Sequence, residues 1–398
     1  VKEVTFDQPD GTLTLFEHPN NVPRVEYDAD GNRLGLLVEE SRTNLVTYSD
    51  VDTTNWTGGA FANISTESVS NPFGFSSVVK VVPTTDTAGG APKRTVQKSI
   101  NVTTGTTYTY SAFVKAAGYN AAYIIFTDRP NVYGGVAYDL STASLIELDG
   151  GNQGTLSNPF IEDFGDGWYR IGFSHDGDGG KDASNGVAVG FVPTGLTKTV
   201  NYGQSSFAGD GISGGYVAGV QVEAGSFPTS YIKTTVNTAT RSADVASIPV
   251  ADFGYNQSAG TVFVEAKASG DSLTFPRVIS FQDDPSNRWE LIGDTTLDVR
   301  IFHRSNGTTD VSSDIISNVL DGETSFKLAY AKAENDAAGS GNGGSVVTDT
   351  SNGQLNNVDT LYIGVGANGS SDFLNGHIKS IKYYPRRLSD AQLVELTS

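Results

Sequence analysis

Residues 214–234, GGYVAGVQVEAGSFPTSYIKT, lie between two long series of strand-like runs. The valines of this stretch, from Val217 to Val222, alternate with small or polar residues, and this alternation predicts a half-buried strand. Glu223-Ala-Gly ends that strand, and a new extended segment begins at Phe227. A second strand rhythm starts near residue 245, so the stretch marks the end of one domain and the approach to another.

Working outward, short strand-like runs recur every 10 to 20 residues on both sides of this stretch, with Gly, Asn, Asp and Pro between them. This spacing is typical of β-sandwiches and jelly rolls. The 46 glycines and the scarcity of helix-period segments also favour an all-β fold. We therefore predict two β-sandwich (jelly-roll) domains in tandem, residues 41–240 and 241–398, behind a short N-terminal arm, residues 1–40.

Two local elements are predicted inside this frame. RVEYDADGNRLGLLVEE, residues 24–40, has two apolar-alternating runs around Asp30-Gly31, a strong hairpin signal within the arm. The tail LSDAQLVELTS, residues 388–398, predicts a helix, because Ser389 is a natural N-cap and Leu393 and Leu396 fall on one face.

Charge and composition exclude several classes of partner. The formal charge is −19, from 26 basic and 45 acidic residues, which disfavours nucleic acid and anionic lipid as ligands. The chain has no cysteine, so it has no disulfide and no thiolate site. No apolar run approaches the ~20 residues that cross a bilayer, so we expect no membrane insertion. The acidity suits a protein that works outside a cell.

Four segments in the same order resemble a known family. They are GLLVEESRTNLVTYSDVDTTNW (35–56), DGWYRIGFS (166–174), VQVEAGSFPTSYIKT with TRSAD (220–244) and FLNGHIKSIKYYPRRLSDAQLVELTS (373–398). The set resembles bacteriophage tail, fibre and head-spike proteins, in which a carbohydrate-binding-module-like jelly roll precedes a concanavalin A-like or laminin-G-like domain. The resemblance implies a virion-surface protein that binds host surface polysaccharide and other virion proteins, and that is a homo-oligomer, often a trimer.

Catalytic motifs are not evident. The histidines, at 18, 175, 303 and 377, have no metal-ligand spacing, and no G-x-S-x-G elbow is present. Glu26-Tyr-Asp28 begins like the acidic strand of concanavalin-like glycosidases but lacks its final Glu. We therefore interpret the chain as a non-enzymatic glycan-binding protein. A carboxylate pair assembled across strands would not be visible in the sequence, so a polysaccharide lyase or glycosidase is an alternative. A purely structural virion spacer is the other alternative.

Sugar sites need an aromatic face with polar groups beside it. Two regions meet this description, although most aromatic side chains in such a chain belong to the core. The first candidate cluster is Trp289 with Asp283, Asp284, Asn287 and Arg288, and the second contains Tyr123 and Tyr133.

The Gly-rich loop HDGDGGKDASNG offers Asp176, Asp178 and Asp182 to a hard cation, with a merely acidic loop as the alternative. The family resemblance implies a structural Ca²⁺, with Glu223 among the residues that would bind it.

Overall fold

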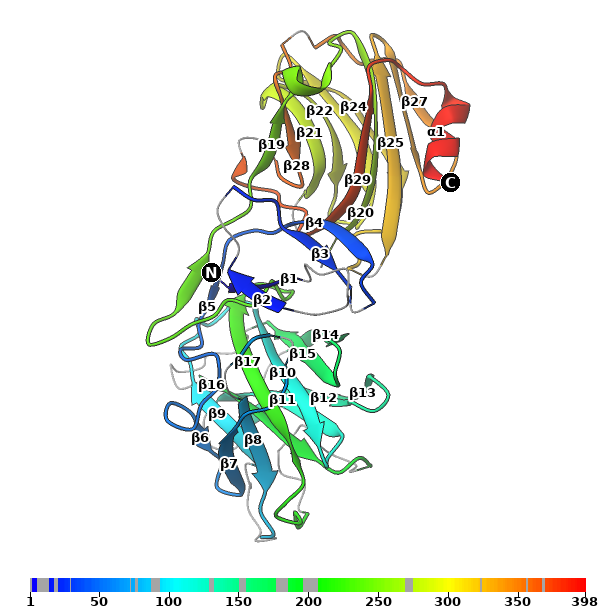
Figure 1. Ribbon diagram of the computed structural model, residues 1–398. Coiled ribbons are helices and arrows are strands. Elements are labelled where there is room, and N and C mark those ends of the chain that lie inside the picture. Colours follow the sequence, from blue (N-terminus) through cyan, green and yellow to red (C-terminus); the bar gives the residue numbers. More distant parts are fainter. Residues whose placement is uncertain are drawn as a thin grey trace. The chain divides into compact units, whose positions relative to one another are not determined.

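The protein is described here by a computed structural model (Figure 1). The structure describes residues 2–5, 14–17, 21–28, 30–71, 73–75, 78–86, 94–128, 132–149, 155–176, 185–195, 207–268, 275–322, 324–355, 357–366 and 369–398. Side chains are described within these ranges except at 2–5, 14–17, 127–128, 132–133 and 185. The chain forms two compact units. The first contains residues 1–20, 29–31 and 42–241, and the second contains residues 21–28, 32–41 and 242–398.

The first unit is a sandwich of two antiparallel six-stranded sheets (Figure 1). One sheet has the order β14 (Leu156–Asp163), β15 (Trp168–His175), β10 (Tyr108–Ala117), β17 (Gly214–Ala224), β8 (Val78–Pro83), β7 (Ala62–Glu67). The other has the order β13 (Ser144–Asp149), β12 (Val132–Asp139), β11 (Ala121–Asp128), β16 (Asn185–Val192), β9 (Thr95–Ser99), β6 (Thr57–Gly58). Two two-stranded sheets accompany them, β1 (Lys2–Thr5) with β2 (Thr14–Glu17) and β5 (Arg42–Asn44) with β18 (Ala239–Arg241).

Residues 214–234 form β17 and the segment that follows it in the first sandwich. β17 sends Val217, Val220 and Val222 into the core between the sheets. A bulge at Gly219, whose φ is +51°, shifts the alternation by one residue, and a Cβ there would lie 2.5 Å from the Phe113 ring. The segment after β17 is not a strand. It returns over the outer face of the sheet, where Glu223 holds it.

The second unit is also a sandwich of two antiparallel sheets. One sheet has the order β19 (Ala246–Pro249), β28 (Thr360–Ile363), β21 (Arg277–Asp284), β22 (Asn287–Gly293), β23 (Val299–Ser305), β24 (Thr308–Ile316). The other has the order β27 (Val347–Asp349), β26 (Asp336–Gly341), β25 (Ser325–Ala333), β20 (Ala259–Ala268), β29 (Gly376–Tyr384), β4 (Arg33–Val38), β3 (Val25–Tyr27). A 3-10 turn, η1 (Val250–Phe253), follows β19.

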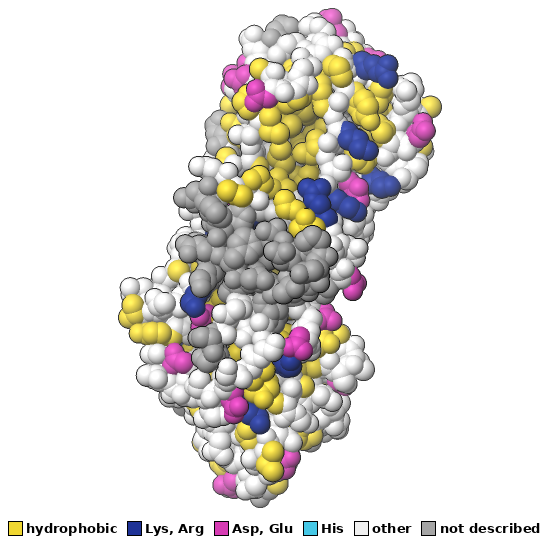
Figure 2. Space-filling model, in the orientation of Figure 1, with side chains coloured by type: hydrophobic (Ala, Val, Ile, Leu, Met, Phe, Trp, Pro, Cys, Tyr) yellow, Lys and Arg dark blue, Asp and Glu magenta, His cyan; other side chains and the backbone are white. Residues whose placement is uncertain are grey.

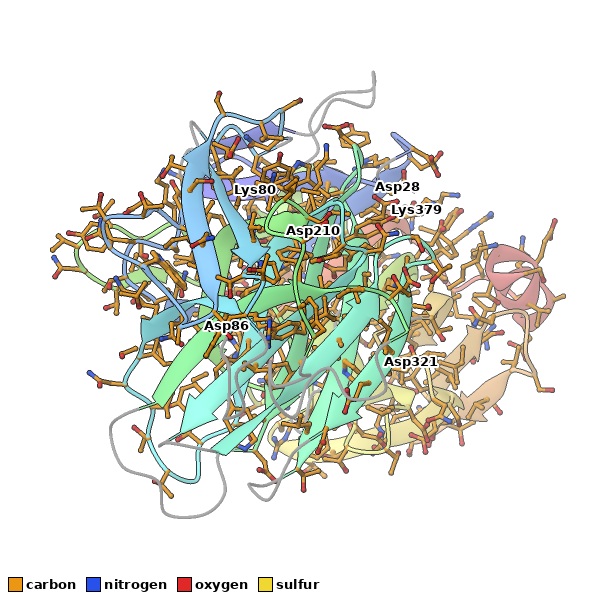
Figure 3. The ribbon with its side chains drawn as sticks, turned by 90° about the horizontal axis from the view of Figure 1, so that it is seen from below. Asp28, Lys80, Asp86, Asp210, Asp321 and Lys379 are labelled. Carbon is orange, nitrogen blue, oxygen red and sulfur yellow. The ribbon has the colours of Figure 1, made fainter. Side chains whose placement is uncertain are left out.

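The predicted N-terminal arm is wrong as a separate element. Its hairpin forms as predicted, with Asn32 N donating to Asp28 Oδ1 at 2.8 Å in the turn between β3 and β4. However, β4 pairs with β29, so that Leu36 lies opposite Ile378 and the hairpin extends the second sandwich. Figure 3 labels Asp28 in this turn and Lys379 on β29. Arg42 and Arg241 are antiparallel partners, so residues 42–241 enter and leave the first unit at adjacent points.

The predicted C-terminal helix is confirmed as α1 (Asp390–Thr397). Ser389 caps it with a capping box, in which the Ser389 hydroxyl accepts from Gln392 N and Gln392 Oε1 accepts from Ser389 N. Leu393 is fully buried against alanines of β25 and β26. The all-β fold class is likewise confirmed, since this is the only α-helix within the described ranges.

Candidate functional site

The cluster predicted around Trp289 does not form an aromatic face. The Trp289 side chain is fully buried in the core of the second sandwich. It stacks on Phe281 with ring centroids 4.3 Å apart, and its Nε1 donates to the Tyr255 hydroxyl at 2.9 Å. Trp289 is therefore a core residue, and its prediction as a sugar platform was wrong.

The polar members of that cluster divide between a turn and the opposite face of β22. Asp284 Oδ1 accepts from Ser286 N at 2.6 Å, and Asn287 Oδ1 accepts from Asn306 N at 2.9 Å. Both side chains thus fix loops at one end of the sheet. Arg288 points to the outer face, because neighbouring residues of a strand point to opposite sides and Trp289 points inward. Of Asp284, Asn287 and Arg288, only Arg288 belongs to the face described below.

The second predicted sugar site, around Tyr123 and Tyr133, also lacks an exposed aromatic ring where the structure describes it. Tyr123 is fully buried, its hydroxyl donates to the Arg94 carbonyl at 3.1 Å, and burial raises the pKa of Tyr123 well above its usual value. Tyr123 therefore offers no open ring, which corrects the prediction. Tyr133 lies in β12, but its side chain is outside the described residues.

The predicted cation site is only partly described. Asp176 Oδ1 accepts from Thr155 N at 3.1 Å, whereas Asp178 and Asp182 lie outside the described residues. Glu223 is a poor calcium ligand here. Its Oε1 accepts from Thr229 N at 2.9 Å and from Gln221 Nε2 at 2.8 Å, and its Oε2 accepts from Thr229 Oγ1 at 2.6 Å.

A second acidic group lies in the other unit. Oxygens of Asp294, Asp298 and Asp314 come within 4.8 Å of one another. Arg300 already forms ion pairs with Asp294 and with Asp314, the latter at 2.9 Å. The group is therefore neutralised in part by an arginine of the same sheet, and it carries no case for a metal ion.

The outer face of β28–β21–β22–β23 presents a row of side chains around a buried carboxylate. We call it the arginine face, and it consists of Arg277, Ser280, Gln282, Arg288, Glu290, Phe302, Arg304 and Tyr362. Its strands send Phe281, Trp289, Leu291, Ile301 and Leu361 into the core, so the alternate residues point outward.

Glu290 organises the centre of the arginine face. Its side chain is fully buried and accepts from Ser280 Oγ at 2.7 Å, from Arg288 Nε at 2.9 Å and from Arg277 Nε at 3.5 Å. Arg277 also forms an ion pair with Asp372 at 3.2 Å. A buried carboxylate that holds two guanidinium groups fixes their positions, since freeing either group would leave a buried charge without its partner.

Two half-buried rings flank this centre. Tyr362 lies opposite Ser280 in the sheet, and Phe302 lies opposite Glu290. Three strand spacings separate the two rings, or about 14 Å. The Arg288 guanidinium lies over the Phe302 ring, 5.1 Å from its centroid. Aromatic rings beside fixed polar groups are the arrangement that sugar rings require.

Sequence reasoning found Arg288 and missed the rest of the arginine face. The signal lay in the cluster itself, because a strand that buries Trp289 must present Arg288 and Glu290 together on its other side. Phe302 and Tyr362 give no comparable signal, since strand register joins them to Glu290 across residues far apart in the chain.

Other charges lie on the second sheet of this unit, and Figure 2 shows Lys and Arg side chains gathered over β29. Lys379 pairs with Glu265 at 3.0 Å, and Lys382 Nζ lies 5.2 Å from the centre of the Phe263 ring. These exposed lysines already have partners on their own sheet.

No helix in the described part of the chain has the length and apolarity to span a membrane.

No protein-family model matches the chain, and no curated protein sequence matches it. Similar solved structures include the CBM40 module of Ruminococcus gnavus IT-sialidase bound to α2,3-sialyllactose, at 17% identity and a TM-score of 0.31 over 36% of this chain and 84% of that one. The LG4-5 domains of the mouse laminin α1 chain align at 9% identity and a TM-score of 0.29, over 94% and 96%. The CBM22-1-CBM22-2 tandem of Paenibacillus barcinonensis Xyn10C aligns at 10% identity and a TM-score of 0.28, over 87% and 99%. The likeness is confined to the fold.

Proposed function

We propose that this protein is a non-enzymatic carbohydrate-binding protein of a bacteriophage surface, and that it contacts host cell-surface glycan through the arginine face. One observation carries the glycan contact. Two half-buried rings, Phe302 and Tyr362, flank polar groups that Glu290 holds in place on one side of a rigid sheet. Sites built on strands keep their geometry better than sites on loops.

The chemistry of this face suits a sugar chain. The apolar C–H faces of pyranose rings pack on aromatic rings, and sugar hydroxyls exchange hydrogen bonds with amides and guanidinium groups. Arg288 supplies such a guanidinium, whereas Gln282, opposite it on β21, is buried and accepts from Ser280 Oγ at 3.4 Å. The separation of the two rings, about 14 Å, spans more than one sugar unit, which favours an extended chain over a single monosaccharide.

We propose that the protein binds glycan without cleaving it, because Glu290 is not placed to act as a catalytic nucleophile. Retaining glycosidases use two carboxyl groups about 5 Å apart, one as nucleophile and one as acid. Both oxygens of Glu290 already accept from donors on the protein. A carboxylate so engaged serves to position arginines, and it is a poor nucleophile.

The support for the virion location is the resemblance of four sequence segments, taken in order, to tail, fibre and head-spike proteins. Many copies on one particle would raise the avidity of a weak site without further contacts. A homo-oligomer, contacts with other virion proteins and a structural Ca²⁺ belong to the same proposal. A density map of the intact particle with this chain placed in it tests the location.

A glycan array combined with a reducing-sugar and lyase assay tests the function. We expect binding without release of new sugar ends. Phe302→Ala and Tyr362→Ala should each weaken binding about ten-fold, equivalent to about 1.4 kcal/mol. Val236→Ala, which trims an exposed side chain of the first unit, is the matched control and should bind as the parent does. Turnover of a bound glycan would favour the enzyme alternative, and the absence of binding would favour a structural spacer.

A further inference from the structure

Two arginines of the arginine face lie opposite each other on adjacent strands. Arg288 of β22 pairs in register with Arg304 of β23. Both point outward, because Trp289 and His303 are buried on the inner side. Like charges directly opposite each other in a sheet destabilise it unless something of opposite charge lies beside them.

Each of these arginines uses its inner nitrogen to fix its position. Arg288 Nε donates to Glu290 Oε2 at 2.9 Å, and Arg304 Nε donates to the Gly307 carbonyl at 2.9 Å. The two terminal nitrogens of Arg288, and those of Arg304, have no hydrogen-bond partner among the residues that the structure describes. The Arg288 side chain is only 9% exposed, and its terminal nitrogens are not among the fully buried polar atoms, so the part of the side chain that reaches the surface includes this outer edge.

This arrangement is built for an anion. A guanidinium presents parallel N–H groups that match the two oxygens of a carboxylate, and such charge-assisted pairs are stronger than hydrogen bonds to neutral groups. The negative charge of Glu290 does not meet the need of this pair, because that carboxylate is shared with Arg277 and Ser280 and approaches Arg288 only at Nε. Arg304 gains nothing from it, since Arg304 bonds to a neutral carbonyl.

We propose that the Arg288–Arg304 pair binds the carboxylate of an acidic sugar in the host glycan, with the sugar ring seated against Phe302. This proposal rests on the proposed function, whose glycan contact it narrows to acidic polysaccharides. Phe302 is the residue next to this pair on the same face, because it precedes Arg304 by two positions on β23 and carries the Arg288 guanidinium over its ring.

The test compares acidic oligosaccharides with neutral forms of the same chains. The probes are oligomers of galacturonic acid and oligomers of a glucuronic acid-containing polysaccharide, each also used after carboxyl reduction to the neutral sugar. With the full chain we expect the acidic form of at least one probe to bind ten-fold or more tightly than its reduced form. Raising the salt concentration should weaken the acidic form more than the reduced form.

Variants assign the preference to the two arginines. Arg288→Gln and Arg304→Gln should each remove the preference for the acidic form. Arg288→Lys should restore it only in part, because a lysine keeps the charge without the planar fork. Lys382→Gln, which removes an exposed cation from the other sheet, should leave the preference unchanged. Melting temperatures report whether each variant is folded, and Arg304→Gln keeps the test valid if Arg288→Gln unfolds.

The outcomes separate the two proposals. Equal binding of acidic and reduced probes would overturn the acidic-sugar proposal and leave glycan binding intact. An acid preference that survives both arginine variants, or that Lys382→Gln abolishes, would overturn it as well. Failure of every glycan on the array to bind would overturn the proposed function itself.

Discussion

The two sandwiches each carry a buried glutamate on an outer sheet face, and the contrast between these faces shows how a covered structural network differs from the candidate binding site. In the first unit, Glu223 accepts three hydrogen bonds from Gln221 and Thr229, and the segment from Ser226 to Thr235 covers the sheet. In the second unit, Glu290 accepts from Arg277 and Arg288, and the terminal nitrogens of Arg288 have no hydrogen-bond partner among the described residues. The first face is covered by a segment of its own chain, whereas on the second face none of the described residues bonds to the terminal nitrogens of Arg288.

The cover of the first face is itself well packed. Tyr231 is 1% exposed, contacts Phe75 and Phe113 edge to face, and its hydroxyl lies 2.6 Å from Ser49 Oγ and 2.7 Å from Asp50 Oδ1. Tyr362 on the arginine face is half-buried, and none of the hydrogen bonds described for the chain reaches its hydroxyl. Tyr231 is therefore a core residue of its unit, whereas Tyr362 packs on Val38, Val365 and Phe373 and keeps part of its ring exposed.

Removing β3 and β4 from the second unit should have the largest effect on its unfolding free energy. A chain of residues 242–398 alone lacks β3 and β4, which bury Leu37 and Val38 and pair with β29. We expect it to lose about 5 kcal/mol of unfolding free energy, at roughly 2 kcal/mol for each buried aliphatic side chain plus the lost ladder. Residues 21–41 joined to 242–398 by a short Gly-Ser linker should unfold cooperatively, as followed by circular dichroism in urea. Equal stability of the two fragments would contradict the strand order.

Replacing Tyr231 and Tyr362 should give the next largest difference in unfolding free energy. Tyr231→Ala should destabilise the protein by about 4 kcal/mol, because it leaves a large cavity under Phe75 and Phe113. Tyr362→Ala should cost less, about 1 to 2 kcal/mol, because its ring is partly exposed and packs only at the edge of the Val38, Val365 and Phe373 cluster. Thermal and urea unfolding of both variants measure the difference. If the two variants lose similar free energy, the contrast between a covered and an open face fails.

Replacing the first glutamate tests its structural role. Glu223→Gln should lower the unfolding free energy by about 3 kcal/mol, because an amide nitrogen would face the donors of Thr229. Glycan affinity per folded molecule should stay unchanged. Calcium titration followed by melting temperature adds a check, since a calcium-dependent rise in the parent that Glu223→Gln abolishes would place an ion at Glu223 after all.

A buried lysine under the arginine face gives a pH test. Lys332 is 2% exposed beside Trp289, and burial lowers its pKa to about 8. Between pH 8 and pH 10.5 the unfolded chain binds this proton more often than the folded chain, so unfolding free energy should rise with pH. We expect Lys332→Met to be more stable than the parent at pH 7 by about 2 to 3 kcal/mol and to lack this rise. The difference between parent and variant, measured from pH 7 to 10.5, should shrink toward zero, and a constant difference would contradict the assignment.

The sequence predicted local elements well and long-range pairing poorly. The turn at Asp30-Gly31 and the cap at Ser389 depend on neighbouring residues, and both predictions are confirmed. The pairing of β4 with β29 joins residues more than 300 positions apart, so no local pattern could assign the hairpin to the second sandwich. Because the hairpin lies near the N-terminus, ahead of the first sandwich in the sequence, it was predicted to be part of a separate arm.

The sequence prediction missed the candidate site by one residue, for a physical reason. Alternation predicts which residues share a face, but it identifies the inner face only where the outer face is exposed and polar. From Arg288 to Gly293 every residue of β22 is buried, on both faces of the sheet. Trp289 was accordingly assigned to the site, although its neighbours Arg288 and Glu290 are the residues that lie there.

The most direct test of the open face is a crystal structure of the protein soaked with the strongest glycan from the array. We expect sugar density over Phe302 and Tyr362, with the glycan in contact with the terminal nitrogens of Arg288. Density over β11 and β12 of the first unit, or anywhere away from the arginine face, would contradict it.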